Sequence, residues 1–225
     1  MSTKKQSLLI QMFHVHKTYG SKNALVDLNL DVYKNDFLFI TGPSGAGKTT
    51  LLKLLYLAEP VTDGQVLVDG MNLARISKKK IPYVRRMFGI IFQDYKLIPT
   101  NTIFENVALV LEVAGSDKRT IHKRVNHVLR TVGMEDRKQA FPPSLSGGEQ
   151  QRVAVARAIV GNPKIILADE PTGSLDAESA DIIFNLLEQF HARGGTVLVA
   201  THDALLLQKA GPRIIRLKAG TRLQE

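Results

Sequence analysis

Residues 42–50 have residue types and spacing that suit the binding of phosphate groups. They read Gly42, Pro43, Ser44, Gly45, Ala46, Gly47, Lys48, Thr49 and Thr50, which is the spacing of a P-loop. Glycines let a backbone fold into a concave nest whose amide hydrogens converge on one anion, and a helix that starts there adds its positive N-terminal end. We expect Lys48 to reach the β- and γ-phosphates and Thr49 to offer its hydroxyl to Mg²⁺. The sequence therefore predicts a nucleoside triphosphate site.

Two adjacent carboxylates follow an apolar run at residues 165–168. Asp169 ends this run, where a P-loop enzyme places the carboxylate that holds Mg²⁺, and Glu170 comes next. Glu170 is expected to orient the water that attacks the γ-phosphate. The alternative is a pair of ordinary solvated acids at a strand end, which a P-loop upstream makes less favoured.

A second element suited to phosphate is the run Leu-Ser-Gly-Gly-Glu-Gln-Gln at residues 145–151. Ser146 and Glu149 have the spacing of a capping box, which predicts a helix start. Gly147 and Gly148 come directly after the cap, although glycine costs roughly 1 kcal/mol more than alanine in a helix. Exposed amides there would make a second anion site; the alternative is simply a well-capped helix. Either the chain binds two ligands, or this element completes the first site across a subunit interface.

The elements that must position these groups are three short apolar runs, at residues 37–41, 165–168 and 197–200. Runs of this kind are typical of parallel strands buried on both faces. The P-loop, the Asp169–Glu170 pair and His202 directly follow them. Because ligands gather at the carboxyl ends of parallel strands, we expect all three groups to lie at one edge of a sheet.

The remaining pattern predicts a fold of the α/β class. Leu28, Leu30 and Val32 alternate with polar residues, which favours an antiparallel sheet near the N-terminus, and residues 95–145 have helical periodicity. We expect a P-loop NTPase core with a mainly parallel sheet, an N-terminal antiparallel β subdomain and an inserted helical subdomain. The expected boundaries are a single domain over 1–225, with the core at 1–94 and 163–225 and the helical part at 95–162.

Composition limits the classes of function. The 225 residues carry a net charge of +9 and no cysteine, so disulfides and thiolate metal sites are excluded. The apolar stretch at residues 8–10 is too short for the core of a secretion signal, and no apolar run approaches the roughly 18 residues that span a bilayer. We therefore expect a cytosolic chain. The basic residues are not interleaved with aromatic ones, which favours a solvated surface over specific nucleic-acid binding.

Taken together, these motifs resemble the ATP-binding subunits of ABC transporters over essentially the whole chain. The resemblance is carried, in order, by the P-loop, Gln93, residues 145–151, residues 165–170, Ser174–Asp176 and His202. It implies an ABC ATPase fold with ATP and Mg²⁺ as ligands. It also implies that two copies pair head to tail around two ATP molecules, so that Ser146, Gly147 and Gly148 of one copy contact the γ-phosphate held by the other.

The resemblance also implies roles for single residues. Tyr19 matches the aromatic residue that stacks on adenine, and Gln93 matches the glutamine that senses Mg²⁺ and the attacking water. Asp176 matches the aspartate that communicates across the dimer. The implied catalytic residues are Glu170, His202, Gln93 and Lys48, and the implied metal ligands are Thr49, Gln93 and Asp169. Because the set is complete, an active ATPase is expected.

Within the family, the run Asp-Glu-Pro-Thr-Gly-Ser-Leu-Asp at residues 169–176 indicates one smaller group of ATPases. It resembles the lipoprotein-release, macrolide-export and bacterial cell-division ATPases, and the cell-division group most closely. That resemblance implies a homodimer in the ATP state, an integral membrane partner similar to FtsX, activation of cell-wall hydrolases, and a peripheral place on the cytoplasmic face of the plasma membrane. The alternatives are the two other members of the group, a soluble ABC enzyme acting on ribosomes or DNA, and an ATP-gated scaffold.

Overall fold

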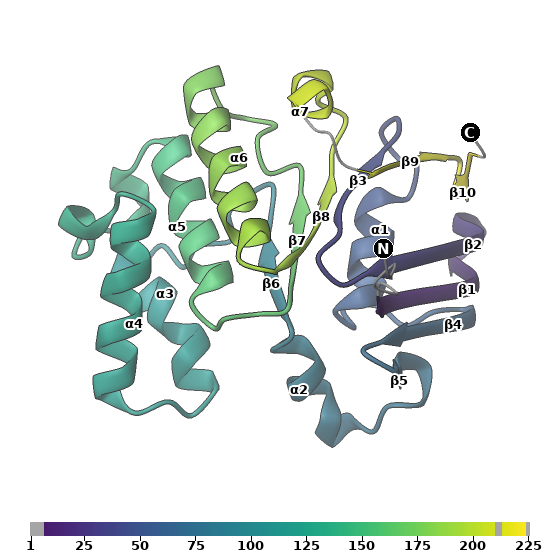
Figure 1. The fold of residues 1–225 in the computed structure, drawn as a ribbon, viewed down its shortest axis with the longest axis horizontal. Coiled ribbons are helices and arrows are strands. Elements are labelled where there is room, and N and C mark those ends of the chain that lie inside the picture. Colours follow the sequence, from purple (N-terminus) through teal and green to yellow (C-terminus); the bar gives the residue numbers. More distant parts are fainter. Residues whose placement is uncertain (1–6, 210–212, 224–225) are drawn as a thin grey trace, which may run out of the picture.

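The chain forms two β-sheets and a separate group of helices (Figure 1). The computed structural model describes residues 7–209 and 213–223. One sheet has four strands in the order β2-β1-β4-β5, and the other has six in the order β10-β9-β3-β8-β7-β6. Among the described residues, no helix has the length and apolarity needed to cross a membrane.

The four-stranded sheet is antiparallel, as the alternating pattern near the N-terminus predicts. Its strands are β1 (Leu8–Tyr19), β2 (Lys22–Tyr33), β4 (Asp63–Val68) and β5 (Met71–Asn72). Strand β1 pairs with both β2 and β4, and bulges interrupt both pairings. Leu28, Leu30 and Val32 are buried while the residues between them are more exposed, so one face of the sheet packs on the core.

The six-stranded sheet is mainly parallel and contains all three apolar runs. Its strands are β3 (Phe37–Thr41), β6 (Phe88–Ile91), β7 (Ile165–Asp169), β8 (Thr196–Ala200), β9 (Arg213–Lys218) and β10 (Thr221–Arg222). Strands β9, β3, β8, β7 and β6 are parallel neighbours, and β10 is antiparallel to β9. The carboxyl ends of β3, β7 and β8 therefore meet at one edge.

The helices divide between the two sides of this sheet. They are α1 (Lys48–Leu55), α2 (Ile81–Arg85), α3 (Ile103–Val113), α4 (Lys118–Thr131), α5 (Gly147–Ile159), α6 (Ala177–Ala192) and α7 (Ala204–Lys209). In Figure 1, α3, α4 and α5 lie together on the left, and α6 lies between them and the strands. The helical periodicity after residue 95 thus corresponds to a real group of helices.

Two apolar clusters pack against opposite faces of the parallel sheet. Leu167 and Leu198 join α1 and the antiparallel sheet in one cluster, whereas Ile166 and Val197 join α3–α6 in the other. Because successive side chains of a strand point to opposite faces, residues 38–40, 165–168 and 197–200 are each buried by one cluster or the other. This explains why the runs are continuously apolar, and it fixes the strand ends from which the polar groups extend.

Candidate functional site

The P-loop connects the end of β3 to the start of α1. Gly47, which immediately precedes α1, has a φ of 104°, a left-handed conformation that favours glycine. A Cβ at Gly47 would lie 2.6 Å from the Ala24 carbonyl oxygen and 2.8 Å from a Leu25 methyl group, so no side chain fits. The amide of Leu51 donates to the Gly47 carbonyl at 2.9 Å and starts the helix. Glycine is needed here both for backbone conformation and for close packing against β2.

Lys48 is almost completely buried, and its ammonium group lies inside the loop. Its Nζ atom donates to the Gly42 carbonyl at 2.8 Å and lies 3.5 Å from a carboxylate oxygen of Glu170. A buried ammonium needs such oxygen partners because desolvation of an unpaired charge is costly. The side chain is therefore held at the mouth of the amide nest, where a phosphate oxygen can replace the carbonyl partners.

Asp169 and Thr49 face each other at the same edge of the sheet. The Thr49 hydroxyl donates to Asp169 Oδ1 at 3.1 Å. Burial raises the pKa of Asp169 above its usual value, and the hydrogen bond from Thr49 opposes that effect. A cation would relieve the cost of burying this carboxylate.

The oxygen atoms of Asp169 and Thr49 fit Mg²⁺, which typically binds one or two carboxylates together with substrate phosphates. Among the described residues, no group of three or more His, Cys, Asp or Glu side chains could hold a metal ion alone. A cation at this position would therefore take its remaining ligands from phosphate and water oxygens.

Glu170 has the most constrained geometry in the site. Its φ is 46°, which is unusual for a residue with a side chain, and it is buried. Thr201 Oγ1 donates to one carboxylate oxygen at 3.0 Å, and His202 Nδ1 lies 2.7 Å from the other. Left-handed backbone costs about 1–3 kcal/mol and persists only where the surroundings hold it, which is common at functional sites. These contacts fix the carboxylate beside Lys48.

A cavity of about 420 Å³ opens over these residues. Tyr19, Gln93, Glu170, His202 and the loop residues from Pro43 to Thr50 all line it. The structure thus brings the predicted residues of β1, the P-loop, β7 and β8 to one cavity. Gly42 and Asp169 are not part of this lining, but they accept hydrogen bonds from the lining residues Lys48 and Thr49.

Three residues at this site carry no motif that sequence reasoning recognised. Thr201 holds Glu170, and its position directly after the apolar run 197–200 was the available signal. Lys22 and Ala24 line the cavity from β2. In the sequence, the one feature that could have identified these two residues is that they lie close to Tyr19, across the β1–β2 turn.

The second predicted phosphate element lies outside this cavity. Ser146 caps α5: its hydroxyl accepts from the Glu149 amide at 3.3 Å, and its own amide donates to the Glu149 carboxylate at 2.8 Å, which confirms the capping box. The hydrogen bond from the Ser146 amide lowers the pKa of Glu149. Ser146, Gly148 and Asp176 line a separate hollow of about 320 Å³. A single chain therefore presents the two phosphate elements at different places.

The two glycines at the start of α5 also have a packing reason. A Cβ at Gly148 would lie 2.4 Å from the Ser179 hydroxyl on α6, and one at Gly147 would lie 2.9 Å from the Tyr95 hydroxyl. Close helix contact therefore accounts for part of the choice of glycine. It also brings Asp176, the N-cap of α6, close to the α5 start.

Arg157, a half-buried residue of α5, binds the segment that follows Gln93. Arg157 donates to the carbonyls of Tyr95 and Lys96 at 2.6 and 2.5 Å, and these two residues have left-handed φ angles of 57° and 50°. Burial lowers the pKa of the Arg157 guanidinium. The Tyr95 hydroxyl lies 3.1 Å from that of Ser174. Sequence reasoning did not identify Arg157, because a helical arginine has no motif of its own.

Fold and site together define a nucleotide-binding ATPase, and comparison with known proteins gives the family. Residues 25–173 match the family model described as ABC transporter. The chain belongs to this family and is an ABC-type ATPase, which hydrolyses ATP to ADP and phosphate.

Several relatives within the family carry the name FtsE. The chain is 45% identical over 213 residues to the cell division ATP-binding protein FtsE of Streptococcus pneumoniae strain D39. The aligned region covers 94% of this chain and 93% of that protein. It is 44% identical to FtsE of Bacillus subtilis, with the same coverage, and 42% identical to FtsE of Escherichia coli K12, over 94% of this chain and 96% of that protein.

Two solved structures show the same fold. One is a dimer of the ATP-binding cassette MJ0796 in a post-hydrolysis state with ADP and Pi, with a TM-score of 0.89, 36% identity and coverage of 96% of this chain and 97% of that one. The other is cbiO1 from Clostridium perfringens, part of the transporter complex cbiONQ, with a TM-score of 0.88, 27% identity and coverage of 97% and 88%. The predicted α/β ABC ATPase fold is confirmed.

Proposed function

We propose that this ATPase is an FtsE-like subunit that dimerises when ATP binds and drives an integral membrane partner in cell division. The observation that carries the proposal is the position of Glu170, held by Thr201 and His202 beside Lys48 at the edge of the P-loop cavity. Similarity to FtsE proteins over nearly their whole length supports the cellular role. We also retain the division into a core at 1–94 and 163–225 and a helical part at 95–162.

In the proposed reaction, Glu170 orients a water molecule for in-line attack on the γ-phosphorus of ATP. A new phosphorus–oxygen bond forms to the water, the bond to the β–γ bridging oxygen breaks, and ADP leaves with that oxygen. Both protons of the water stay with the released phosphate, so the products are ADP and dihydrogen phosphate. The carboxylate of Glu170 accepts a hydrogen bond from the water and directs its lone pair at phosphorus. His202 lies beside Glu170, where it can contact the γ-phosphate, and Gln93 lines the same cavity near the water.

The remaining residues bind and neutralise the triphosphate. The P-loop amides and Lys48 hold the β- and γ-phosphates, and Thr49 and Asp169, with Gln93, would hold Mg²⁺. When bound, Mg²⁺ supplies positive charge that stabilises the phosphate oxygens as charge shifts onto the leaving group. Tyr19, 40% exposed at the cavity rim, would stack on the adenine.

A second copy of the chain would complete the site. Ser146, Gly147 and Gly148 start α5 away from the P-loop cavity of their own chain, so they can reach a γ-phosphate only in another molecule. Head-to-tail pairing would bring this helix start, with its positive end, onto the phosphate that the partner binds. Hydrolysis would remove the bridging group and let the copies separate.

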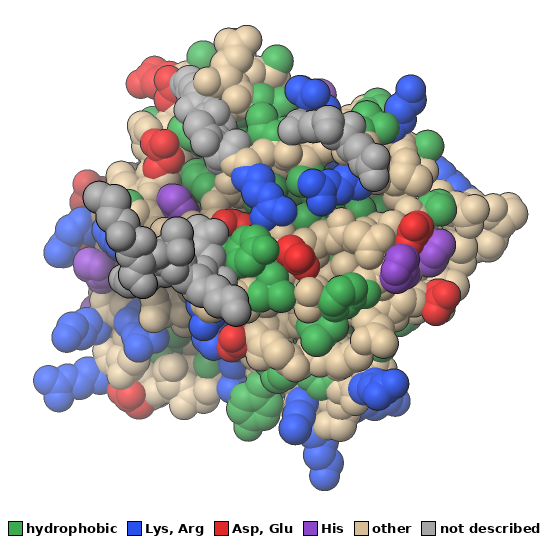
Figure 2. All heavy atoms as spheres, turned by 45° about the vertical axis from the view of Figure 1, so that its right-hand side comes forward, with side chains coloured by type: hydrophobic (Ala, Val, Ile, Leu, Met, Phe, Trp, Pro, Cys, Tyr) green, Lys and Arg blue, Asp and Glu red, His purple; other side chains and the backbone are tan. Residues whose placement is uncertain are grey.

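The membrane partner would dock beside the segment that follows Gln93. Ile98 is exposed and Tyr95 and Leu97 are half-buried, so this segment presents apolar surface next to the nucleotide cavity. The protein would then lie on the cytoplasmic face of the plasma membrane through an FtsX-like subunit. On the face shown in Figure 2, Lys and Arg side chains are dispersed.

The test of the nucleotide mechanism is Glu170→Gln, which keeps the size of the side chain and removes its charge. We expect ATP binding to persist, turnover to fall by about 10²–10⁴-fold, and a stable dimer to form with ATP. Steady-state phosphate release and light scattering measure these outcomes. Glu188→Gln, on the exposed side of α6, is the matched control and should behave as wild type. Full turnover in Glu170→Gln, or only monomers with ATP, would contradict the mechanism.

The partner is tested by isolating the Glu170→Gln protein with ATP from detergent-solubilised membranes of the source cells. We expect one integral membrane protein to co-purify, and turnover of the wild-type chain to change when that protein is added back in vesicles. Salt-sensitive binding of nucleic acid by the purified chain, with no membrane protein retained, would favour the soluble class of ABC enzyme instead.

A further inference from the structure

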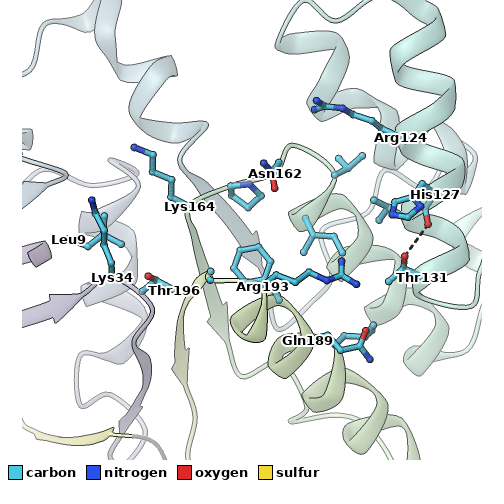
Figure 3. A pocket seen from close by; sticks show the side chains of 18 residues that line it. Leu9, Lys34, Arg124, His127, Thr131, Asn162, Lys164, Gln189, Arg193 and Thr196 are labelled. Carbon is cyan, nitrogen blue, oxygen red and sulfur yellow. Dashed lines mark hydrogen bonds between the residues drawn. The ribbon is translucent and has the colours of Figure 1, made fainter. Parts of the chain in front are cut away.

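A hollow of about 580 Å³ lies between the helical group and the two sheets, away from the nucleotide cavity (Figure 3). Lys164 and Thr196, which line it, stand at the amino ends of β7 and β8. The P-loop cavity is at the carboxyl ends of the same strands. The proposed ATPase function therefore uses none of the residues of this hollow.

The rim of the hollow is strongly cationic. Lys34, Arg124, Lys164 and Arg193 line it, and no described lining residue is an aspartate or glutamate. Lys164 pairs with Asp69 at 2.5 Å, outside the lining. Within the described part of the chain, Lys34, Arg124 and Arg193 form no ion pair. Three positive charges thus remain around one concavity, where they raise the local concentration of anions.

The two arginines approach from different elements. Arg124 extends from α4, and Arg193 follows the end of α6, at the turn that leads to β8. Figure 3 shows Arg193 reaching across the hollow toward α4, while Arg124 lies further along α4, apart from it. A guanidinium presents planar donors that match phosphate oxygens in pairs. Arg193 is thus the guanidinium that crosses the hollow, and Arg124 adds positive charge at its rim.

The inner wall of the hollow is apolar. Val128, Val160 and Leu186 are buried there, and the half-buried ring of Phe190 is part of the same wall. A bare inorganic anion would leave this wall in contact with water. An apolar wall with a few convergent charged groups, in a volume of about 300–1,000 Å³, is typical of sites for small organic molecules.

We propose that this hollow is a second ligand site, which binds a small organic phosphate with an aromatic or aliphatic body. The phosphate would bind Arg193, with Arg124 and Lys34 adding longer-range attraction, and the body would pack on Val128 and Phe190. Because α4 belongs to the helical group while Arg193 leads into the parallel sheet, the ligand would join the two parts of the molecule.

The test uses 1-naphthyl phosphate as the probe, with saturating ADP and Mg²⁺ present so that the P-loop cavity is occupied. Calorimetry should show saturable one-to-one binding with a dissociation constant of about 1 mM or below. Inorganic phosphate, which lacks the apolar body, and 1-naphthol, which lacks the charge, should each bind at least about tenfold more weakly.

The double variant Arg124→Gln with Arg193→Gln should weaken probe binding at least about tenfold. The matched control is Arg119→Gln with Lys123→Gln, which removes the same charge from exposed positions of α4 outside the hollow and should keep wild-type affinity. Unchanged ATP affinity in both variants shows that they fold. No saturable binding, equal weakening in the two variants, or binding of polyglutamate but not of the probe would each overturn the proposal.

Discussion

Tyr19 is held in place by Lys17, a lysine that is only 6% exposed. Lys17 Nζ lies 4.7 Å from the centre of the Tyr19 ring and is bound by Glu59 and the Pro60 carbonyl, each at 3.0 Å. These partners offset the cost of burying the ammonium, and the ammonium in turn attracts the face of the ring. The ring is thereby positioned at the rim of the cavity before any nucleotide arrives.

The role of Tyr19 in binding the base can be separated from any structural role by two substitutions. Tyr19→Leu should weaken ATP binding about tenfold, because stacking of a base on an aromatic ring is worth ~1–3 kcal/mol. Tyr19→Phe keeps the ring and should retain nearly full affinity. Neither change should alter the affinity for inorganic triphosphate, which has no base. Equilibrium titrations measure all four constants; equal loss in both variants would contradict stacking.

At the scale of elements, the features that the sequence predicts correctly are those that depend on residues close together in the chain. The capping box at Ser146 and Glu149 and the buried strand before Asp169 are short-range patterns, and the structure has both. The left-handed Tyr95 and Lys96 could not be predicted, since Arg157 on a distant helix stabilises their conformation. The clustering of Thr201 with Glu170 likewise depends on the pairing of β7 with β8.

Helices α3 and α5 begin with the same kind of capping box, so matching substitutions in the two caps can separate an effect on stability from an effect on dimerisation. Thr102 and Glu105 form a capping box on α3 like that of Ser146 and Glu149 on α5. Thr102→Ala and Ser146→Ala should each lower the free energy of unfolding by about 1 kcal/mol, which denaturant titration measures. Only Ser146→Ala should also weaken ATP-dependent dimerisation. If both variants lose dimerisation equally, Ser146 acts only as a cap.

These caps also predict the direction of a pH effect. Hydrogen bonds from the N-cap residue lower the pKa values of Glu105 and Glu149, so each ionised carboxylate is favoured in the folded state. Their contribution to stability is present above the ordinary glutamate pKa and is lost as the pH falls through the lower folded-state pKa. Thr102→Ala keeps the backbone amide that donates to Glu105, so the α3 contribution is removed instead by Glu105→Gln. The stability of Glu105→Gln, measured by denaturant titration at several pH values, should depend less on pH in that acidic window.

At the scale of the whole molecule, α5 links the two surfaces that a nucleotide cycle must coordinate. It begins at the capped Ser146, which would meet a second copy, and carries Arg157 near its other end. Arg157 donates hydrogen bonds to the carbonyls of Tyr95 and Lys96. These two residues follow shortly after Gln93, which lines the nucleotide cavity. Arg157 therefore holds the segment that leaves the nucleotide cavity after Gln93 against the same helix whose start would meet the second copy.

This connection is tested by Arg157→Met, which keeps most of the side-chain volume and removes both donors. Two backbone carbonyls would lose their partners, so the free energy of unfolding should fall by about 1–3 kcal/mol. ATP affinity should be unchanged, because Arg157 does not line the nucleotide cavity. Turnover per folded molecule should fall, since Gln93 and the α5 start would then move independently. Arg119→Met, exposed on α4, is the control; lower stability with unchanged turnover would limit Arg157 to a structural role.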